Sequence, residues 1–350
     1  MQENGGSGRT PIAMVALAVA VGLMVALGLA EVLTRIFVPD PGFVFENRPS
    51  LFVPNPITGY RNRPSYHAYA QGTIRVRTNS LGHRGKEIIV KKPKGTFRIL
   101  GLGDSVMWGT GIDEERIFLS LLQSKLQKES RGKRHLEVVN EAVIGYSLHQ
   151  ELLTLEHYGV AMSPDIVILG FVMNDAYPTE DPFFNVHTFH APRKLKVGRT
   201  TYKEEPPPRF YLYRLTRTMA RRTRDWWISS GNPSVPQNPW APESFEVKSW
   251  PVLQRHFHRL QEISNKAGSR LLVILFPTRT ALRWVDGRMF PQSLLSDWMD
   301  SAGIACLDLN DTLGGLDDVF LDEMHLSSKG HSLVADRILK YLRVKNWLPG

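Results

Sequence analysis

Short, mostly apolar runs alternate with segments of helical periodicity from about residue 97 to the end of the chain. The runs cover residues 99–102, 136–140, 166–170, 271–276 and 304–309. Apolar side chains recur at helical spacing over residues 118–126, 148–155, 250–260 and 334–342. Strands that alternate with helices in this way predict an α/β fold, in which about five parallel strands are covered by helices on both faces. Ligands of such sheets bind beyond the carboxyl ends of the strands, so we expect the functional residues there.

A second pattern lies near the N-terminus, where residues 10–30 carry no charge between Arg9 and Glu31. As a helix this stretch would be roughly 31 Å long, which is the thickness of the hydrocarbon core of a bilayer. The sequence therefore predicts a transmembrane anchor within residues 1–38, with a cleaved signal peptide as the alternative. Since long domains are translocated largely regardless of charge, we expect a single-pass membrane protein whose large C-terminal part lies on the extracytoplasmic side.

The rest of the chain divides by composition. Residues 39–95 are rich in Pro, Gly, Asn and Arg, and the alternation of apolar and basic side chains over residues 74–77 is typical of a half-buried strand. We interpret this region as a stalk with a small β-element that precedes a catalytic domain over residues 96–346. An insertion at about 176–247 interrupts that domain, and its residues 211–219 form an amphipathic segment. A solvated cap helix, a lid and a membrane-surface helix are the open interpretations of this segment.

Composition and charge exclude several classes of protein. The chain has 350 residues and 42% hydrophobic content, which excludes a disordered protein. Its one cysteine, Cys306, lies in an apolar run and excludes internal disulfides and metal sites built on several cysteines. His187 and His190 have no evident third ligand, and His256 and His258 would point to different sides of a predicted helix. We therefore expect no metal. With no nucleotide-binding motif, we also expect no cofactor.

The net charge of +9 raises the question of a polyanionic partner. No recognisable nucleic-acid module accompanies this charge, so we expect no nucleic acid to bind. Beside a membrane anchor, anionic lipid headgroups or a polyanionic polysaccharide are the more plausible partners.

Small and polar residues follow the predicted strands. Ser105 ends a Gly-Asp-Ser tripeptide directly after the first strand, where the next helix begins. Gly145 follows the second strand and Asn174 the third. Near the C-terminus, Asp322 and His325 stand three residues apart, so the carboxylate can fix the imidazole tautomer. Each of these features alone is also compatible with ordinary turn or helix-cap chemistry.

Together these residues resemble the SGNH (GDSL-type) hydrolases, because the four sequence blocks of that family occur in order over about residues 96–345. The chain departs from the family pattern at Val106, Ala142 and Val172, where the family usually has Leu, Gly and Gly. The motif at residues 79–85 is similar to one that precedes the catalytic domain in some membrane-anchored members.

The resemblance implies a three-layer α/β/α, flavodoxin-like fold and a serine mechanism. It assigns Ser105 as nucleophile, His325 as general base and Asp322 as the residue that orients it. The oxyanion donors it implies are the backbone N–H groups of Ser105 and Gly145 and the side-chain amide of Asn174.

We therefore predict a serine hydrolase that cleaves O-acyl esters through an acyl-serine intermediate. A carbohydrate O-acetyl ester is the first choice of substrate, and an acylated lipid is a further one. One alternative is a polysaccharide O-acyltransferase of the same fold, in which a sugar hydroxyl replaces water as the acceptor. The other is a catalytically silent, membrane-tethered binding protein.

Overall fold

The computed structural model of the chain describes residues 12–37, 51–70, 74–131, 134–176, 195–197, 200–202, 216, 250–279 and 292–349. The chain divides into two compact units. One comprises residues 1–43 and 206–235, and the other comprises residues 44–205 and 236–350. The sheet and the candidate site belong to the second unit.

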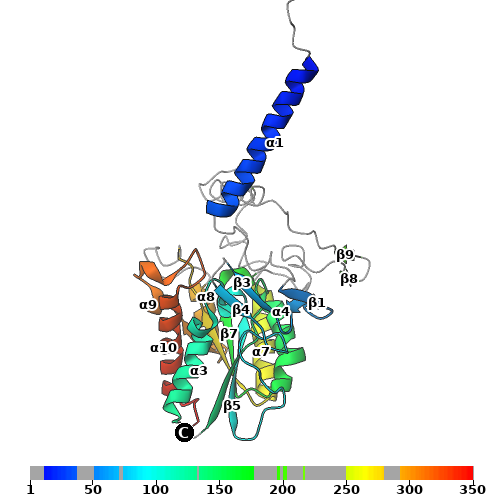
Figure 1. Cartoon of the computed structure of the whole chain (residues 1–350). Helices are drawn as coiled ribbons and strands as arrows, with labels where there is room; N and C mark the ends of the chain where they lie inside the picture. Colours follow the sequence, from blue (N-terminus) through cyan, green and yellow to red (C-terminus); the bar gives the residue numbers. More distant parts are fainter. Residues whose placement is uncertain are drawn as a thin grey trace, which may run out of the picture. The chain divides into compact units, whose positions relative to one another are not determined.

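Five parallel strands form the central sheet of that unit (Figure 1). They are β5 (Thr96–Gly103), β6 (His135–Asn140), β7 (Ile166–Phe171), β10 (Arg270–Leu275) and β11 (Ala305–Asp308). The strand order is β11-β10-β7-β5-β6, which is the flavodoxin-like order with its switch point between β5 and β7. Each of the five predicted strands is present within a few residues of its expected bounds, so the predicted α/β fold is confirmed.

Alternate residues of the strands face two different helical layers. On β7, Ile166 and Ile168 belong to one hydrophobic core, while Val167 and Leu169 belong to the other. The first core includes side chains of α3 (Phe118–Glu129) and α10 (Ser328–Val344), which lie side by side in Figure 1. The second core includes side chains of α4 (Leu148–Thr154), α7 (Trp250–Lys266) and α8 (Gln292–Ser301). β7 is buried at every residue and β10 at every residue but the first, which explains why their sequences are continuous apolar runs.

Two short elements at the carboxyl ends of strands carry candidate residues, α2 (Ser105–Trp108) after β5 and η5 (Met173–Ala176) after β7. The other short elements are η2 (Glu114–Arg116), η3 (Leu155–Gly159), η4 (Val160–Met162), α9 (Asn310–Leu313) and η8 (Asp317–Val319).

The region before β5 forms two antiparallel hairpins. They pair β1 (Phe52–Asn55) with β2 (Gly59–Asn62), and β3 (His67–Ala70) with β4 (Ile74–Arg77). The sequence predicts a stalk with a small β-element here, and β4 coincides with the expected strand. In the structure, Phe52, Tyr60 and Val76 are buried in the same core as α3 and α10. The described part of this region therefore shares its packing with the sheet.

The other unit contains α1 (Ile12–Phe37), which covers most of the predicted anchor. Its residues Ile12–Ile36 have a mean hydropathy of 2.7 and are long and apolar enough to cross a membrane. A signal sequence passes the same test, so the helix is consistent with both N-terminal interpretations.

Within the insertion, the structure describes the hairpin of β8 (Leu195–Val197) and β9 (Thr200–Tyr202). The amphipathic segment at 211–219 lies outside the described residues, apart from residue 216.

Candidate active site

Ser105 lies at the sharp turn where β5 ends and α2 begins. The turn requires Gly103, whose φ is +153° and whose added Cβ would lie 2.2 Å from Cγ of Met107. Asp104 caps the helix, because its Oδ1 accepts the backbone N–H of Val106 at 2.9 Å. Ser105 is consequently held at the start of a helix, and its side chain lies at the carboxyl edge of the sheet with 8% of the residue exposed.

A chain of hydrogen bonds joins three of the predicted residues. Nε2 of His325 lies 2.8 Å from Oγ of Ser105, and Nδ1 of His325 lies 2.7 Å from Oδ2 of Asp322. An ionised carboxylate only accepts hydrogen bonds, so Nδ1 carries the ring proton and Nε2 is left to accept from the serine hydroxyl. This is the arrangement in which an imidazole can remove a proton from a nucleophile.

The electrostatics of Asp322 match this assignment. Partial burial of the carboxyl works against ionisation, but hydrogen bonds from the ring and backbone of His325 and from the backbone of Met324 outweigh it and lower the pKa of Asp322 to about 2. Asp322 is therefore a carboxylate at neutral pH, although its side chain is 49% exposed. It can both orient the imidazole and stabilise its protonated form.

The segment that carries Asp322 and His325 is closed by backbone bonds at its base. Phe320 and Leu326 form an antiparallel bridge, and the N–H of Leu321 donates to the carbonyl of His325 at 2.7 Å. From outside the segment, Nη2 of Arg279 donates to the carbonyl of Phe320 at 2.8 Å. Sequence reasoning did not identify Arg279, because a lone arginine after a strand has no distinctive pattern.

Gly145 lies in the buried loop that follows β6. The N–H of Glu141 donates to the carbonyl of Gly101 at 2.9 Å, and the N–H of Val143 donates to the carbonyl of Gly103 at 3.0 Å. The loop therefore runs along the end of β5, directly before Ser105. Gly145 adopts φ +77°, a conformation that side chains other than glycine rarely take.

Asn174 belongs to η5, the turn that follows β7, and its side chain lies outside the described atoms. Its neighbour Asp175 is fully buried and braces this turn, since Oδ2 accepts the N–H of Val172 at 2.7 Å. The structure thus brings Ser105, His325 and Asp322 into contact, and it places Gly145 and Asn174 on segments that follow strands next to β5.

A buried carboxyl group on α4, Glu151, was not identified from the sequence. Neither of its side-chain oxygens has a hydrogen-bond partner among the described residues. Burial and the charge of Asp104 raise the pKa of Glu151, and burial with the charges of Glu151 and Asp104 raises the pKa of Asp175. The sequence did contain a signal, because Glu151 stands at helical spacing from Leu148 and Leu155 on the apolar face of its helix.

Within the described residues, no group of three metal-ligating side chains is close enough to hold an ion. His187 and His190 lie outside the described residues. His256 is buried on α7 with its ring 5.1 Å from that of His149, and His258 packs against Trp298.

A comparison with models of protein families shows the family of this chain. The family model described as GDSL-like lipase/acylhydrolase matches residues 99–338, which is more than half of the chain. The chain belongs to this family. It is accordingly a carboxylic ester hydrolase of the SGNH (GDSL) type, and the match extends from β5 to α10.

Solved structures of a lipolytic protein and of two esterases are similar to this chain at low sequence identity. A member of the G-D-S-L lipolytic family from Veillonella parvula DSM 2008 is 13% identical, with 70% of this chain and 97% of that chain covered and a TM-score of 0.40. The acetyl xylan esterase AlAXEase is 13% identical, with coverages of 70% and 100% and a TM-score of 0.42. A two-domain esterase active on acetylated mannans is 13% identical, with coverages of 71% and 49% and a TM-score of 0.42. No curated protein matches the chain.

Proposed function

We propose that this ester hydrolase uses Ser105, His325 and Asp322 as a catalytic triad. The observation that supports the proposal is the continuous chain of contacts from Oγ of Ser105 through the ring of His325 to Asp322, with distances of 2.8 and 2.7 Å. All three residues stand at the carboxyl edge of a flavodoxin-like sheet, where ligands of such folds bind.

In the proposed reaction, Oγ of Ser105 attacks the carbonyl carbon of the ester while Nε2 of His325 takes the hydroxyl proton. The tetrahedral intermediate collapses as the bond to the leaving oxygen breaks, and the imidazolium returns its proton to the leaving alcohol. Water then attacks the acyl-serine with the same proton transfers and releases the carboxylic acid. Asp322 stabilises the imidazolium in both halves of the reaction.

The oxyanion of each intermediate needs donors that are already in place. We assign this role to the backbone N–H groups of Ser105 and Gly145 and to the amide of Asn174. Removal of one such donor typically lowers kcat by roughly 10²–10³. The first N–H of a helix and a glycine at positive φ are both suited to donate to an oxyanion.

The proposed substrate is an O-acyl ester of a polar alcohol, with a carbohydrate O-acetyl ester as first choice. The 49% exposure of the Asp322 side chain leaves this end of the triad open to solvent. We further propose that residues 1–38 anchor the chain in a membrane and that the hydrolase unit lies on the extracytoplasmic side, where envelope polysaccharides are available.

The test uses the full chain in detergent and a fluorophosphonate probe that labels activated serines. We expect Ser105→Ala to abolish both labelling and hydrolysis of p-nitrophenyl acetate. Ser124→Ala is the matched control, because that hydroxyl bonds only to the carbonyl of Ser120 within α3 among the described contacts. Labelling that persists in Ser105→Ala would overturn the proposed nucleophile.

The substrate class is tested on the same preparation. Acetylated oligosaccharides and long-chain p-nitrophenyl esters are compared by kcat/KM, and the products are analysed with and without a sugar acceptor. We expect acetate release from the oligosaccharide to be the faster reaction. A preference for long acyl chains would contradict the proposed substrate, and an acetylated acceptor as the main product would show an acyltransferase.

A further inference from the structure

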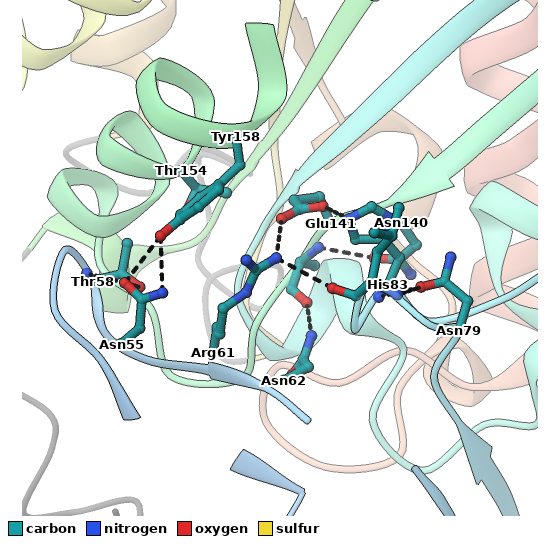
Figure 2. A network of polar contacts seen from close by, with 12 residues as sticks. Asn55, Thr58, Arg61, Asn62, Asn79, His83, Asn140, Glu141, Thr154 and Tyr158 are labelled. Carbon is teal, nitrogen blue, oxygen red and sulfur yellow. Dashed lines mark hydrogen bonds and ion pairs between the residues drawn. The ribbon is translucent and has the colours of Figure 1, made fainter. Parts of the chain in front are cut away.

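The loop after β6, residues 141–146, is held along its length by the segment that precedes the sheet. We call residues 51–84 the N-terminal element and residues 141–146 the β6 loop. Figure 2 shows the polar network between them, in which Arg61, Asn62 and His83 of the N-terminal element point toward Glu141 and its neighbours. The contacts begin one residue before the loop, where the N–H of Arg84 donates to the carbonyl of Asn140 at 3.2 Å.

Glu141 anchors the start of the β6 loop through two basic side chains. Nη2 of Arg61 lies 3.3 Å from its Oε1, and Nε2 of His83 contacts its Oε2. The carboxylate is 4% exposed, so these contacts compensate a charge that burial would otherwise destabilise. Tyr158 covers the same cluster, with its ring 4.4 Å from the guanidinium of Arg61.

Two side chains of β2 fix backbone carbonyls further along the loop. Nδ2 of Asn62 donates to the carbonyl of Ala142 at 2.9 Å, and the hydroxyl of Tyr60 donates to the carbonyl of Ile144 at 2.9 Å. Both are buried, and Tyr60 is fully so. Hydrogen bonds of this kind cannot be replaced by water without a rearrangement of the loop.

The bond from Tyr60 has a consequence for Gly145. The carbonyl of Ile144 and the N–H of Gly145 belong to one planar trans peptide unit, in which the two groups point in opposite directions. A hydroxyl that holds the carbonyl on one side of the loop therefore fixes the N–H on the other side. That N–H is the donor to which the proposed mechanism assigns part of the oxyanion charge.

Tyr146, on the other side of Gly145, is also bound by the N-terminal element. Its hydroxyl lies 2.9 Å from Oγ1 of Thr58 and also contacts the carbonyl of Tyr60. The rings of Tyr60 and Tyr146 meet edge to face, with centroids 5.3 Å apart. The residues on both sides of Gly145 are thus tied to the same few residues of the N-terminal element.

Tyr60 remains a hydrogen-bond donor under all ordinary conditions. Burial, followed by the influence of Tyr146 and of Asp104, raises the pKa of Tyr60 well above its ordinary value.

We propose that Tyr60 is a positioning residue of the ester-hydrolysis site, which aims the N–H of Gly145 at the oxyanion through its bond to the carbonyl of Ile144. The inference rests on the proposed function, because it needs Gly145 to be an oxyanion donor. It extends the site to a residue on β2, which lies before the 99–338 segment that matches the family.

The test replaces Tyr60 by Phe in the full chain, which removes one oxygen and keeps the ring in the core. We expect kcat for p-nitrophenyl acetate to fall about 10-fold at nearly constant KM, which is less than the roughly 10²–10³ expected for loss of a whole oxyanion donor. The rate is expressed per serine labelled by the fluorophosphonate probe at saturation. A merely structural role for Tyr60 would lower the number of labelled sites and leave the rate per site unchanged.

Tyr158→Phe is the matched control, because it also removes a hydroxyl from this network. That hydroxyl bonds to the side chain of Asn55, at 2.9 and 3.2 Å, and the ring over Arg61 is retained. We expect kcat per labelled site to stay within about two-fold of wild type in this variant. Tyr146→Phe removes the other tyrosine hydroxyl that holds the β6 loop, and we expect kcat per labelled site to fall in this variant as it does in Tyr60→Phe.

The outcomes separate this inference from the proposed function. If Ser105→Ala abolishes hydrolysis while Tyr60→Phe and Tyr146→Phe match Tyr158→Phe in rate per site, the positioning role is refuted and the triad stands. If Ser105→Ala retains hydrolysis, both proposals are refuted. A selective loss of kcat in Tyr60→Phe, with an unchanged shape of the pH profile, supports the inference.

Discussion

Replacement of Asp322 by Asn tests the proposed triad through the geometry of a single carboxylate. Oδ1 of Asp322 accepts two backbone N–H groups, from Met324 at 3.0 Å and from His325 at 2.8 Å, while Oδ2 faces Nδ1 of His325. Asparagine has one side-chain acceptor, and the two N–H groups require it at the Oδ1 position. Its NH₂ group must then face Nδ1, which forces the ring proton onto Nε2. Nε2 can then no longer accept the proton of Ser105.

The size of the effect follows from the same bonds. Turning the amide around to restore the productive tautomer would break two backbone hydrogen bonds at about 0.5–1.5 kcal/mol each, or roughly 1–3 kcal/mol together. The productive population would therefore fall roughly 5- to 150-fold, since 1.4 kcal/mol corresponds to a factor of ten. Loss of the half-exposed charge beside the imidazolium adds no more than about 1 kcal/mol, or about five-fold. We expect kcat/KM to fall roughly 5- to 750-fold.

Asp322→Ala provides the decisive comparison. Alanine presents no NH₂ group to Nδ1, so both ring tautomers remain accessible, and we expect this variant to be more active than Asp322→Asn. The assay measures hydrolysis of p-nitrophenyl acetate from pH 5 to 9, expressed per fluorophosphonate-labelled site. Because the pKa of Asp322 is lowered to about 2, its stabilising bonds are fully present above the ordinary aspartate pKa and are lost only as the pH falls toward 2. Asp322 therefore does not titrate within the assay range. An Asn variant as active as the Ala variant would refute the tautomer argument.

Two further predictions concern the buried charges around the site. Arg84 donates to the carbonyls of Trp108 and Gly109 at 2.8 Å and of Ile112 at 2.5 Å, so Arg84→Met leaves these buried acceptors unpaired. We expect this variant to lose about 2–4 kcal/mol of folding stability, measured as a lower Tm. An unchanged Tm would contradict this role of Arg84. Burial and neighbouring charge raise the pKa of Glu151, so the stability it contributes is present at acid pH and is lost as the pH rises through its raised pKa. We expect the urea midpoint of wild type to fall between pH 5 and pH 8 and that of Glu151→Gln to fall less; equal falls in the two proteins would show that Glu151 is not the titrating group.

The sheet could be predicted from the sequence because its central strands are buried on both faces and its edge strands are still largely apolar. This pattern located the five strands, and the rule that parallel strands share a carboxyl edge placed Ser105, Gly145 and Asn174 at that edge. The resemblance to the SGNH hydrolases joined Asp322 and His325 to Ser105. Their contacts in the structure agree with that placement, while their catalytic roles remain predictions. The position of Gly145 on the β6 loop follows from the same rule.

The part of the site before the sheet could not be predicted, because many of the residues that it buries are polar. Tyr60, Arg61 and Arg84 bond to side chains and to backbone carbonyls that are distant in sequence, and no periodicity indicates such bonds. A segment rich in Arg, Asn, Gly and Pro therefore looked like a stalk. These side chains can be buried only because they bond to specific acceptors on the segments that follow β5 and β6.

The N-terminal element explains how short segments can hold a catalytic geometry. The helix α2 has four residues, too few to be stable through its own hydrogen bonds. Asp104 caps its first turn and Arg84 binds the carbonyls at its end, so the helix that begins at Ser105 is held at both ends. Tyr60 holds the neighbouring β6 loop in the same way. Tyr60 and Arg84 both precede the segment that matches the family. The hydrolase unit is therefore held in part by the N-terminal element, whose residues lie outside the four sequence blocks.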